Sequence, residues 1–90
     1  MRNYFVVVSC YEQNGDLFEA NYWFDVEDDV QKAMAVYTET TRKAYEKAMA
    51  ITNGELISVT SREVSEFEYK RHALTEEGKR ELNMQKRGRN

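Results

Sequence analysis

The sequence predicts one small α+β domain, in which an N-terminal β-hairpin and one or two further antiparallel strands form a sheet with one long helix packed on it. Three observations lead to this prediction. Asn14-Gly15 separates two runs that are rich in Val, Phe, Tyr and Trp, an apolar stripe with helical spacing follows, and residues 56–60 form a β-branched run. The expected order is ββαβ(β), with a short C-terminal helix as a further candidate element.

The hairpin is predicted by the Asn14-Gly15 pair, which suits the positive φ angles of a type I′ turn. A two-residue loop also determines the register of its strands. Residues 3–13 and 16–24 should therefore pair so that Tyr11 lies opposite Phe18 and Phe5 lies opposite Phe24, with Gln13–Asp16 and Val7–Tyr22 as further pairs.

This register divides the hairpin side chains between two faces, because successive strand residues point to opposite sides. The helix face is nearly all apolar or aromatic and comprises Phe5, Val7, Ser9, Tyr11, Phe18, Ala20, Tyr22 and Phe24. The second face is mixed but more apolar than a solvated face, and comprises Tyr4, Val6, Val8, Cys10, Glu12, Leu17, Glu19, Asn21 and Trp23. We expect the helix to cover the first of these faces.

A helix is expected to begin near Asp29, after the acidic run 25–29, and Asp28 with Gln31 resembles a capping box. Its apolar stripe recurs at spacings of four and three over about six turns, through Val30, Met34, Tyr37, Thr41, Ala44, Ala48 and Ile51. Asn53-Gly54 should end the helix, because these residues tolerate the left-handed conformation.

Residues 56–60 read as the third strand, and residues 64–69 read either as its continuation or as a fourth strand after a bend at 61–63. Thr75 could cap a short helix that reaches Leu82, although Gly78 lies inside it at a cost of about 1 kcal/mol relative to Ala. We expect residues 1–84 to form a single domain and residues 85–90 to form a disordered basic tail.

Composition favours a cytoplasmic protein. The lone Cys10 cannot form an internal disulfide, and the sequence contains no Asn-x-Ser/Thr glycosylation acceptor. No apolar run approaches the roughly 20 residues that a membrane helix needs, so we expect no membrane partner. The net charge of −3 is uninformative about partners.

The residue types argue against an enzyme. His72 is the only histidine, which leaves no His pair for a metal, and no basic residue adjoins Cys10 in the sequence to activate its thiol. A calcium loop beginning at Asp25 fails because its sixth and twelfth positions are Val30 and Val36. The glycines fit no phosphate-binding motif. We expect no catalytic residue, no metal and no cofactor.

The second face of the hairpin is the first candidate surface for function. Either residues 64–84 fold back and bury it, or it stays open as an interface, a homodimer included. The residues expected to contact a partner are the apolar side chains around Trp23 and the acids at the start of the helix: Tyr4, Val6, Val8, Leu17, Trp23, Asp25, Glu27, Asp28 and Asp29. The acids would steer the protein toward a basic partner surface.

A charge asymmetry is the second candidate. Residues 1–69 carry 6 basic and 13 acidic side chains, whereas residues 70–90 carry 7 basic and 3 acidic ones. Sheet aromatics such as Tyr4 and Trp23 could stack single-stranded bases, while a basic C-terminal segment contacts phosphates. That segment supplies Lys70, Arg71, Lys79, Arg80, Lys86, Arg87 and Arg89. Acids near the sheet, among them Glu19 and Glu66, weigh against this alternative.

The function expected from the sequence is therefore a non-enzymatic protein-binding module, an inhibitor or adaptor that occludes a surface of a larger protein. Small Pro-free chains with one cysteine are common among accessory proteins of bacteria and their phages, which is an association of composition only. The alternative is a single-stranded nucleic-acid-binding module.

Overall fold

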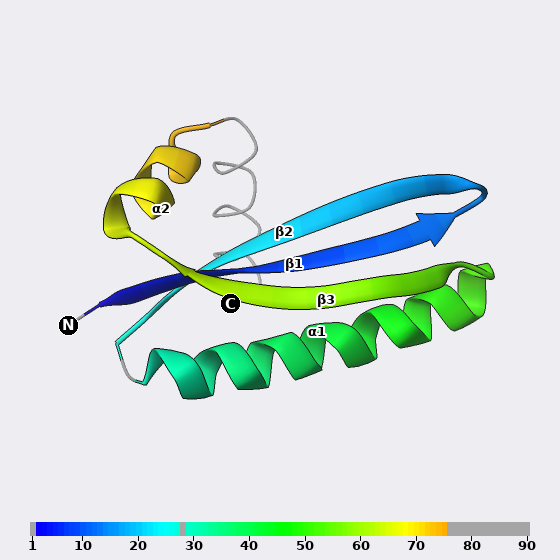
Figure 1. Ribbon diagram of the computed structural model, residues 1–90, viewed down its shortest axis with the longest axis horizontal. Helices are drawn as coiled ribbons and strands as arrows, with labels where there is room; N and C mark the ends of the chain where they lie inside the picture. Colours follow the sequence, from blue (N-terminus) through cyan, green and yellow to red (C-terminus); the bar gives the residue numbers. More distant parts are fainter. Residues whose placement is uncertain (1, 28, 76–90) are drawn as a thin grey trace, which may run out of the picture.

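The computed structural model describes residues 2–27 and 29–75. These residues form strands β1 (Asn3–Gln13) and β2 (Asp16–Val26), helix α1 (Val30–Thr52), strand β3 (Glu55–Val64) and helix α2 (Glu66–Ala73). The three antiparallel strands make one sheet in the order β2-β1-β3. Helix α1 runs along one face of this sheet, and α2 lies on the opposite side at one end (Figure 1). The predicted α+β class is confirmed.

The hairpin has the predicted turn and register. Asn14 and Gly15 have φ angles of 55° and 83°, as a type I′ turn requires. Tyr11 pairs with Phe18, and the pairing continues without a shift to Asn3 opposite Val26. The division into a helix face and a second face therefore holds along both strands.

Helix α1 begins and ends where backbone groups find local partners. The Asp29 carboxylate accepts hydrogen bonds from the backbone N–H groups of Gln31 at 3.0 Å and Lys32 at 3.3 Å. The cap is therefore Asp29, so the capping box proposed for Asp28 was wrong by one residue. Asn53 has a φ of 62° and closes the other end in the left-handed conformation, which confirms the predicted stop.

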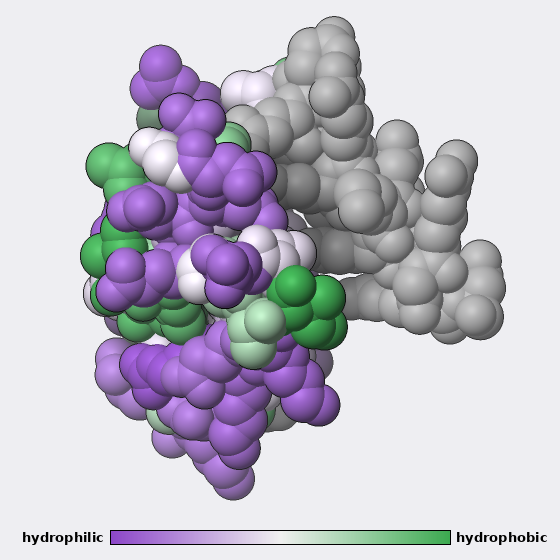
Figure 2. Space-filling view, turned by 90° about the vertical axis from the view of Figure 1, so that its right-hand side faces the viewer, coloured by the Kyte–Doolittle hydropathy of each residue, from purple (hydrophilic) through white to green (hydrophobic). Residues whose placement is uncertain are grey.

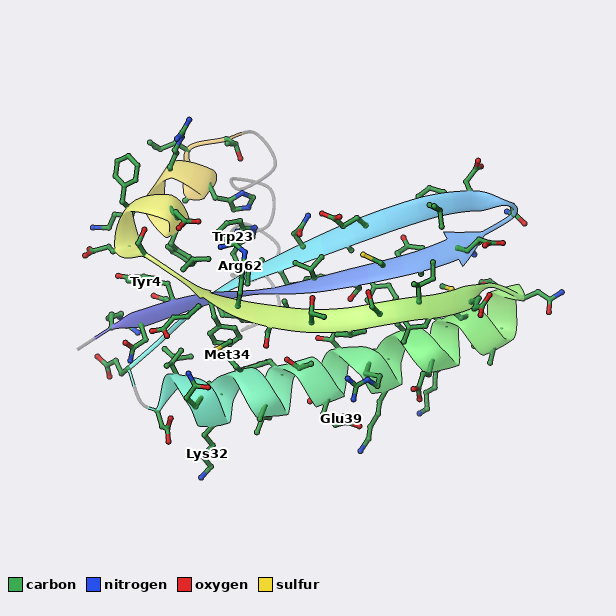
Figure 3. The ribbon with its side chains drawn as sticks, in the orientation of Figure 1. Tyr4, Trp23, Lys32, Met34, Glu39 and Arg62 are labelled. Atoms are coloured by element: carbon green, nitrogen blue, oxygen red, sulfur yellow. The ribbon has the colours of Figure 1, made fainter. Side chains whose placement is uncertain are left out.

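The stripe predicted on α1 is correct in its first half and wrong at its end. Val30 and Met34 pack against the core, and in Figure 3 Met34 points at the sheet whereas Lys32 and Glu39 point away from it. Further along, Met49 is buried whereas Ile51 is exposed. The α1 residues that contact the sheet recur about every fourth residue. Each step of four residues turns the line of contact by about 40° around the helix axis. The strict heptad pattern missed this drift.

Residues 64–69 form no fourth strand. Strand β3 continues through the proposed bend to Val64, and residue 66 then begins α2. The Ser65 hydroxyl accepts a hydrogen bond from the Glu68 N–H at 3.1 Å, which caps the new helix. The helix expected at 75–82 and the disordered tail expected at 85–90 lie outside the described residues, apart from Thr75.

The core lies between the sheet and α1. Phe5, Val7 and Val59 are buried at its centre, and the side chains around them are Phe24, Val26, Val30, Ala33, Met34 and Leu56. The contacts of α1 with the sheet are concentrated on β1 and β3, so β2 lies largely beside the helix. Among residues 2–27 and 29–75, no helix is long and apolar enough to cross a membrane.

A substitution at Gly54 tests how closely the connection between α1 and β3 must approach the hairpin. A Cβ atom at this position would lie 2.8 Å from the backbone carbonyl oxygen of Glu12. Because a backbone atom cannot move aside cheaply, Gly54→Ala should lower the free energy of unfolding by about 1–3 kcal/mol in urea titrations. Asn53→Gly, next to it, should cost little because glycine also adopts the left-handed conformation. Equal stability of both variants would contradict this account.

Ser9 provides a second stability test. Its side chain is fully buried on the helix face, and its hydroxyl has no hydrogen-bond partner in the described part of the chain. Burial of an unpaired hydroxyl is unfavourable, so Ser9→Ala should leave the protein as stable or stabilise it by about 1 kcal/mol. A clear loss of stability in the same titration would show that the hydroxyl has a stabilising partner.

Candidate protein-binding surface

Helix α2 covers part of the second face of the hairpin. The ring of Tyr69 packs on Tyr4 with centroids 4.8 Å apart, and His72 stacks on Trp23 at 4.3 Å and 15°. Val6, between them in the sheet, is only 1% exposed. Figure 3 shows Tyr4 and Trp23 on the side of the sheet that carries α2. Of the two outcomes left open by the sequence, burial holds at this end, where Val6 has almost no surface exposed to a partner.

The other apolar residues predicted around Trp23 differ in their exposure to solvent. Val8 is half-buried in the central strand, whereas Leu17, next to the turn, is 74% exposed. Trp23 lies at the covered end of β2 and Leu17 lies at its tip. The residues expected to act together around Trp23 therefore do not form one open surface.

The acids expected at the contact surface have local roles. Asp25 forms an ion pair with Arg2 at 3.7 Å, and Asp29 caps α1. Glu27 is exposed. Asp28 lies outside the described residues. Asp25 and Asp29 are nevertheless exposed, as Glu27 is, so the described acids still form an acidic surface at the start of α1.

Two of the predicted nucleic-acid contacts lie on α2. Arg71 is exposed, and Lys70 forms an ion pair with Glu66 at 2.7 Å. The hydrogen bond to Glu66 raises the pKa of the Lys70 ammonium group. The other five residues of this set, Lys79, Arg80, Lys86, Arg87 and Arg89, lie outside the described residues.

An open groove lies between the end of β1 and the second half of α1. It has a volume of about 420 Å³. One wall is formed by α1 residues spaced four apart, and the other wall is the end of β1. The lining residues are Tyr11, Gln13, Ala44, Tyr45, Ala48, Met49 and Thr52. We call this the β2–α1 groove, because the aromatic side chains of β2 extend it.

Aromatic rings join the groove to β2. Tyr11 stacks on Phe18 at 5.4 Å and contacts Tyr45 at 5.3 Å. The hydroxyl groups of Tyr22 and Tyr45 share a hydrogen bond across the gap between β2 and α1. Burial, together with this hydrogen bond, raises the pKa of the Tyr45 phenol well above its ordinary value. Tyr45 therefore remains neutral at physiological pH, so its hydroxyl group can both donate and accept hydrogen bonds.

Part of this aromatic surface faces solvent. Phe18 is 44% and Tyr22 is 39% exposed, although both belong to the helix face. Figure 2 looks onto the end of the molecule that carries the turn, where apolar patches interrupt a hydrophilic surface. Ile51, at the adjoining end of α1, is 85% exposed. Lys43, Glu46 and Lys47 lie beside Ala44 on the outer side of α1, so two lysines and one glutamate border that side of the groove.

Cys10 is a half-buried free thiol on the second face, away from the groove. Within the described residues, no group of three His, Cys, Asp or Glu side chains is placed to hold a metal ion. The groove offers apolar surface, two tyrosine hydroxyl groups and nearby ammonium groups.

The sequence pattern missed this surface because it assigned all helix-face aromatics of β2 to the core. Phe24 is indeed packed there, stacked on Tyr37 at 4.6 Å. Phe18 and Tyr22 lie further toward the turn, where α1 covers them only in part. The sequence did contain a signal for this exposed surface. Ala44 and Ala48, on the predicted apolar stripe, are too small to fill a wide space between the helix and the aromatic side chains of β2.

In comparisons with known proteins, no family model, no curated protein and no solved structure matches the chain.

The docking of α2 can be followed through Trp23, the only tryptophan. Tyr69→Ala and His72→Ala each remove a ring that packs on the second face, so each should shift the Trp23 emission to longer wavelength and cost about 1 kcal/mol of stability. Phe67→Ala, on the exposed side of α2, is the matched control and should leave the emission unchanged. The same shift in all three variants would contradict the docking.

Proposed function

We propose that this chain is a non-enzymatic protein-binding module that contacts its partner through the β2–α1 groove. The observation that carries the proposal is the half-exposed aromatic surface of Phe18 and Tyr22 beside that groove. Small soluble domains seldom leave contiguous apolar surface open unless it meets a partner. Aromatic side chains are also enriched among the residues that dominate binding energy.

The shape and charge of the groove indicate what it binds. The α1 wall presents Ala44 and Ala48, whose small side chains allow another backbone to approach closely. Lys43 and Lys47, together with Glu46, border the outer side of that wall and leave it with one net positive charge. A partner segment with apolar side chains flanked by carboxylates fits both features. By occupying such a segment, the protein would act as an inhibitor or adaptor of a larger protein.

The nucleic-acid alternative has less support. Its stacking platform was Tyr4 and Trp23, and α2 packs on both rings. One of its basic residues, Lys70, is paired with Glu66 on the surface of α2. Binding to single strands would weaken steeply with added salt, whereas binding in an apolar groove would not.

The proposal is tested by lysine substitutions on the two sides of α1. Ala48 lines the groove and Ala35 lies on the exposed outer side, so Ala48→Lys and Ala35→Lys add the same charge to the same helix. Wild type and both variants are immobilised as full chains and used to capture proteins from the native cell. We expect at least one protein to bind wild type and Ala35→Lys and to lose about tenfold in affinity for Ala48→Lys.

Circular dichroism first checks that both variants fold, which is expected because alanine and lysine are both good helix formers. If every captured protein binds the three baits equally, the groove is not the contact surface. If the captured material is nucleic acid that is released by moderate salt, the alternative function replaces the proposal.

A further inference from the structure

Helix α1 carries a second stripe of mainly small and apolar residues, on the flank that faces β2. Tyr37 on this flank stacks on Phe24 of β2, whereas the neighbouring Thr38 donates a hydrogen bond to Ser61 of β3. At about 100° of rotation per residue, the stripe lies within about 40° of Ala44 around the helix axis. It recurs at spacings of four and three, and we call it the α1 flank: Ala33, Tyr37, Thr40, Ala44, Ala48 and Ile51.

The α1 flank is exposed near both of its ends. Tyr37 is 40% exposed and the adjacent Val36 is 53% exposed, while Ile51 at the other end is 85% exposed. A hollow of about 550 Å³ lies beside Val36 and Tyr37, and the β2–α1 groove lies beside Ala48. The flank spans residues 33–51, which is about 27 Å at 1.5 Å per residue. Exposed apolar surface therefore accompanies α1 over most of its length.

The geometry of this surface fits a second helix. Helices pack with their axes about 8–10 Å apart, which is about two strand spacings. Because α1 lies over β1 and β3, a helix beside it would lie above β2. Residues three and four apart on α1 form ridges that the ridges of another helix match. Side chains on one face of an extended segment recur about every 6.8 Å and do not match the 5.4 Å pitch of these ridges.

Two lysines border the α1 flank on its solvent side. Lys47 and Lys43 lie about 60° and about 100° from Ala44 around the helix axis. The acids lie further round, with Glu39 about 140° and Glu46 about 160° from Ala44. Glu39 is already engaged in an ion pair at 2.7 Å, and Figure 3 shows it pointing away from the sheet. Between residues 33 and 51, the charges nearest to the flank are therefore positive.

We propose that the partner presents an amphipathic helix of about 18 residues, which lies alongside α1 and above β2. Its apolar face contacts the α1 flank together with Phe18 and Tyr22, and its carboxylates meet Lys43 and Lys47. Asp16 on the helix face of β2 disfavours acids on the other border of the partner helix. The inference rests on the proposed function, and it narrows the partner to a helix with acids along one border.

The probe for this inference is a phage-displayed library in which one surface of a stable helical hairpin is randomised. It is selected on the immobilised full chain. The selected helices should carry apolar residues three and four apart and Asp or Glu along one border of that stripe. Fluorescence anisotropy of a labelled selected helix then gives its dissociation constant for wild type and for each variant.

Two variants of α1 test the length and the charge of the contact, each with a matched control on the opposite side of the helix. Val36→Lys should raise the dissociation constant at least fivefold, whereas Ala35→Lys adds the same charge and should leave it unchanged. Lys47→Glu should raise it about fivefold, whereas Arg42→Glu makes the same change of charge and should have no effect. Circular dichroism checks that all four variants fold.

Three results would overturn the proposal. The first is a library that yields no binding helix, as expected if a second copy or residues 76–90 of the chain occupy the flank. The second is a set of binders whose apolar residues lack helical spacing or whose acids are absent. The third is equal weakening by the variants and their controls, because the helix then binds elsewhere.

The helical partner and the proposed function can fail separately. A native partner that is lost with Ala48→Lys but binds Val36→Lys and Lys47→Glu like wild type would overturn only the long acidic helix. Selected helices that bind as expected, together with no native partner that depends on Ala48, would overturn only the proposed function.

Discussion

A single α-helix is about 10 Å wide with its side chains and covers about two β-strands, which lie about 4.8 Å apart. The sheet of this protein has three strands, and α1 lies over β1 and β3. Strand β2 is therefore only partly covered on the helix face, where Phe18 and Tyr22 are exposed. Tyr37 and Tyr45 reach toward it, and their contacts with Phe24 and Tyr22 are how α1 meets β2. The groove, its aromatic border and its accessibility all follow from this mismatch in width.

The local elements of the fold could be predicted from the sequence because their determinants are adjacent in the chain. Asn14-Gly15 specifies the hairpin and its register, and Asn53 ends α1 through its own backbone conformation. What could not be predicted is how elements sit on one another. Ile51 has the spacing of a core residue and is exposed, because the contact line drifts around α1 as the helix crosses the sheet.

The surface around Trp23 illustrates the same limit. Its apolar residues were identified correctly, but whether Trp23 faces solvent depended on His72, which is 49 positions later in the chain. A local signal was present in Ser65 and Glu68, whose spacing is that of a capping box. The apolar and aromatic content of residues 64–69 concealed it, since short runs of that kind are compatible with strand as well as helix. Once α2 is recognised, Trp23 becomes a point of internal packing.

The central position of β1 has a consequence for how the chain folds. One neighbour of β1 is reached through a two-residue turn, whereas the pairing of Val8 with Thr60 must wait until the chain between them has been brought together. Closing so long a loop is entropically costly, and non-local pairing of this kind slows folding. Helix α1 shortens the distance to be closed, since it spans about 1.5 Å per residue in place of an extended chain. The hairpin and α1 can thus form early from local contacts, and the docking of β3 onto β1 is the step that completes the domain.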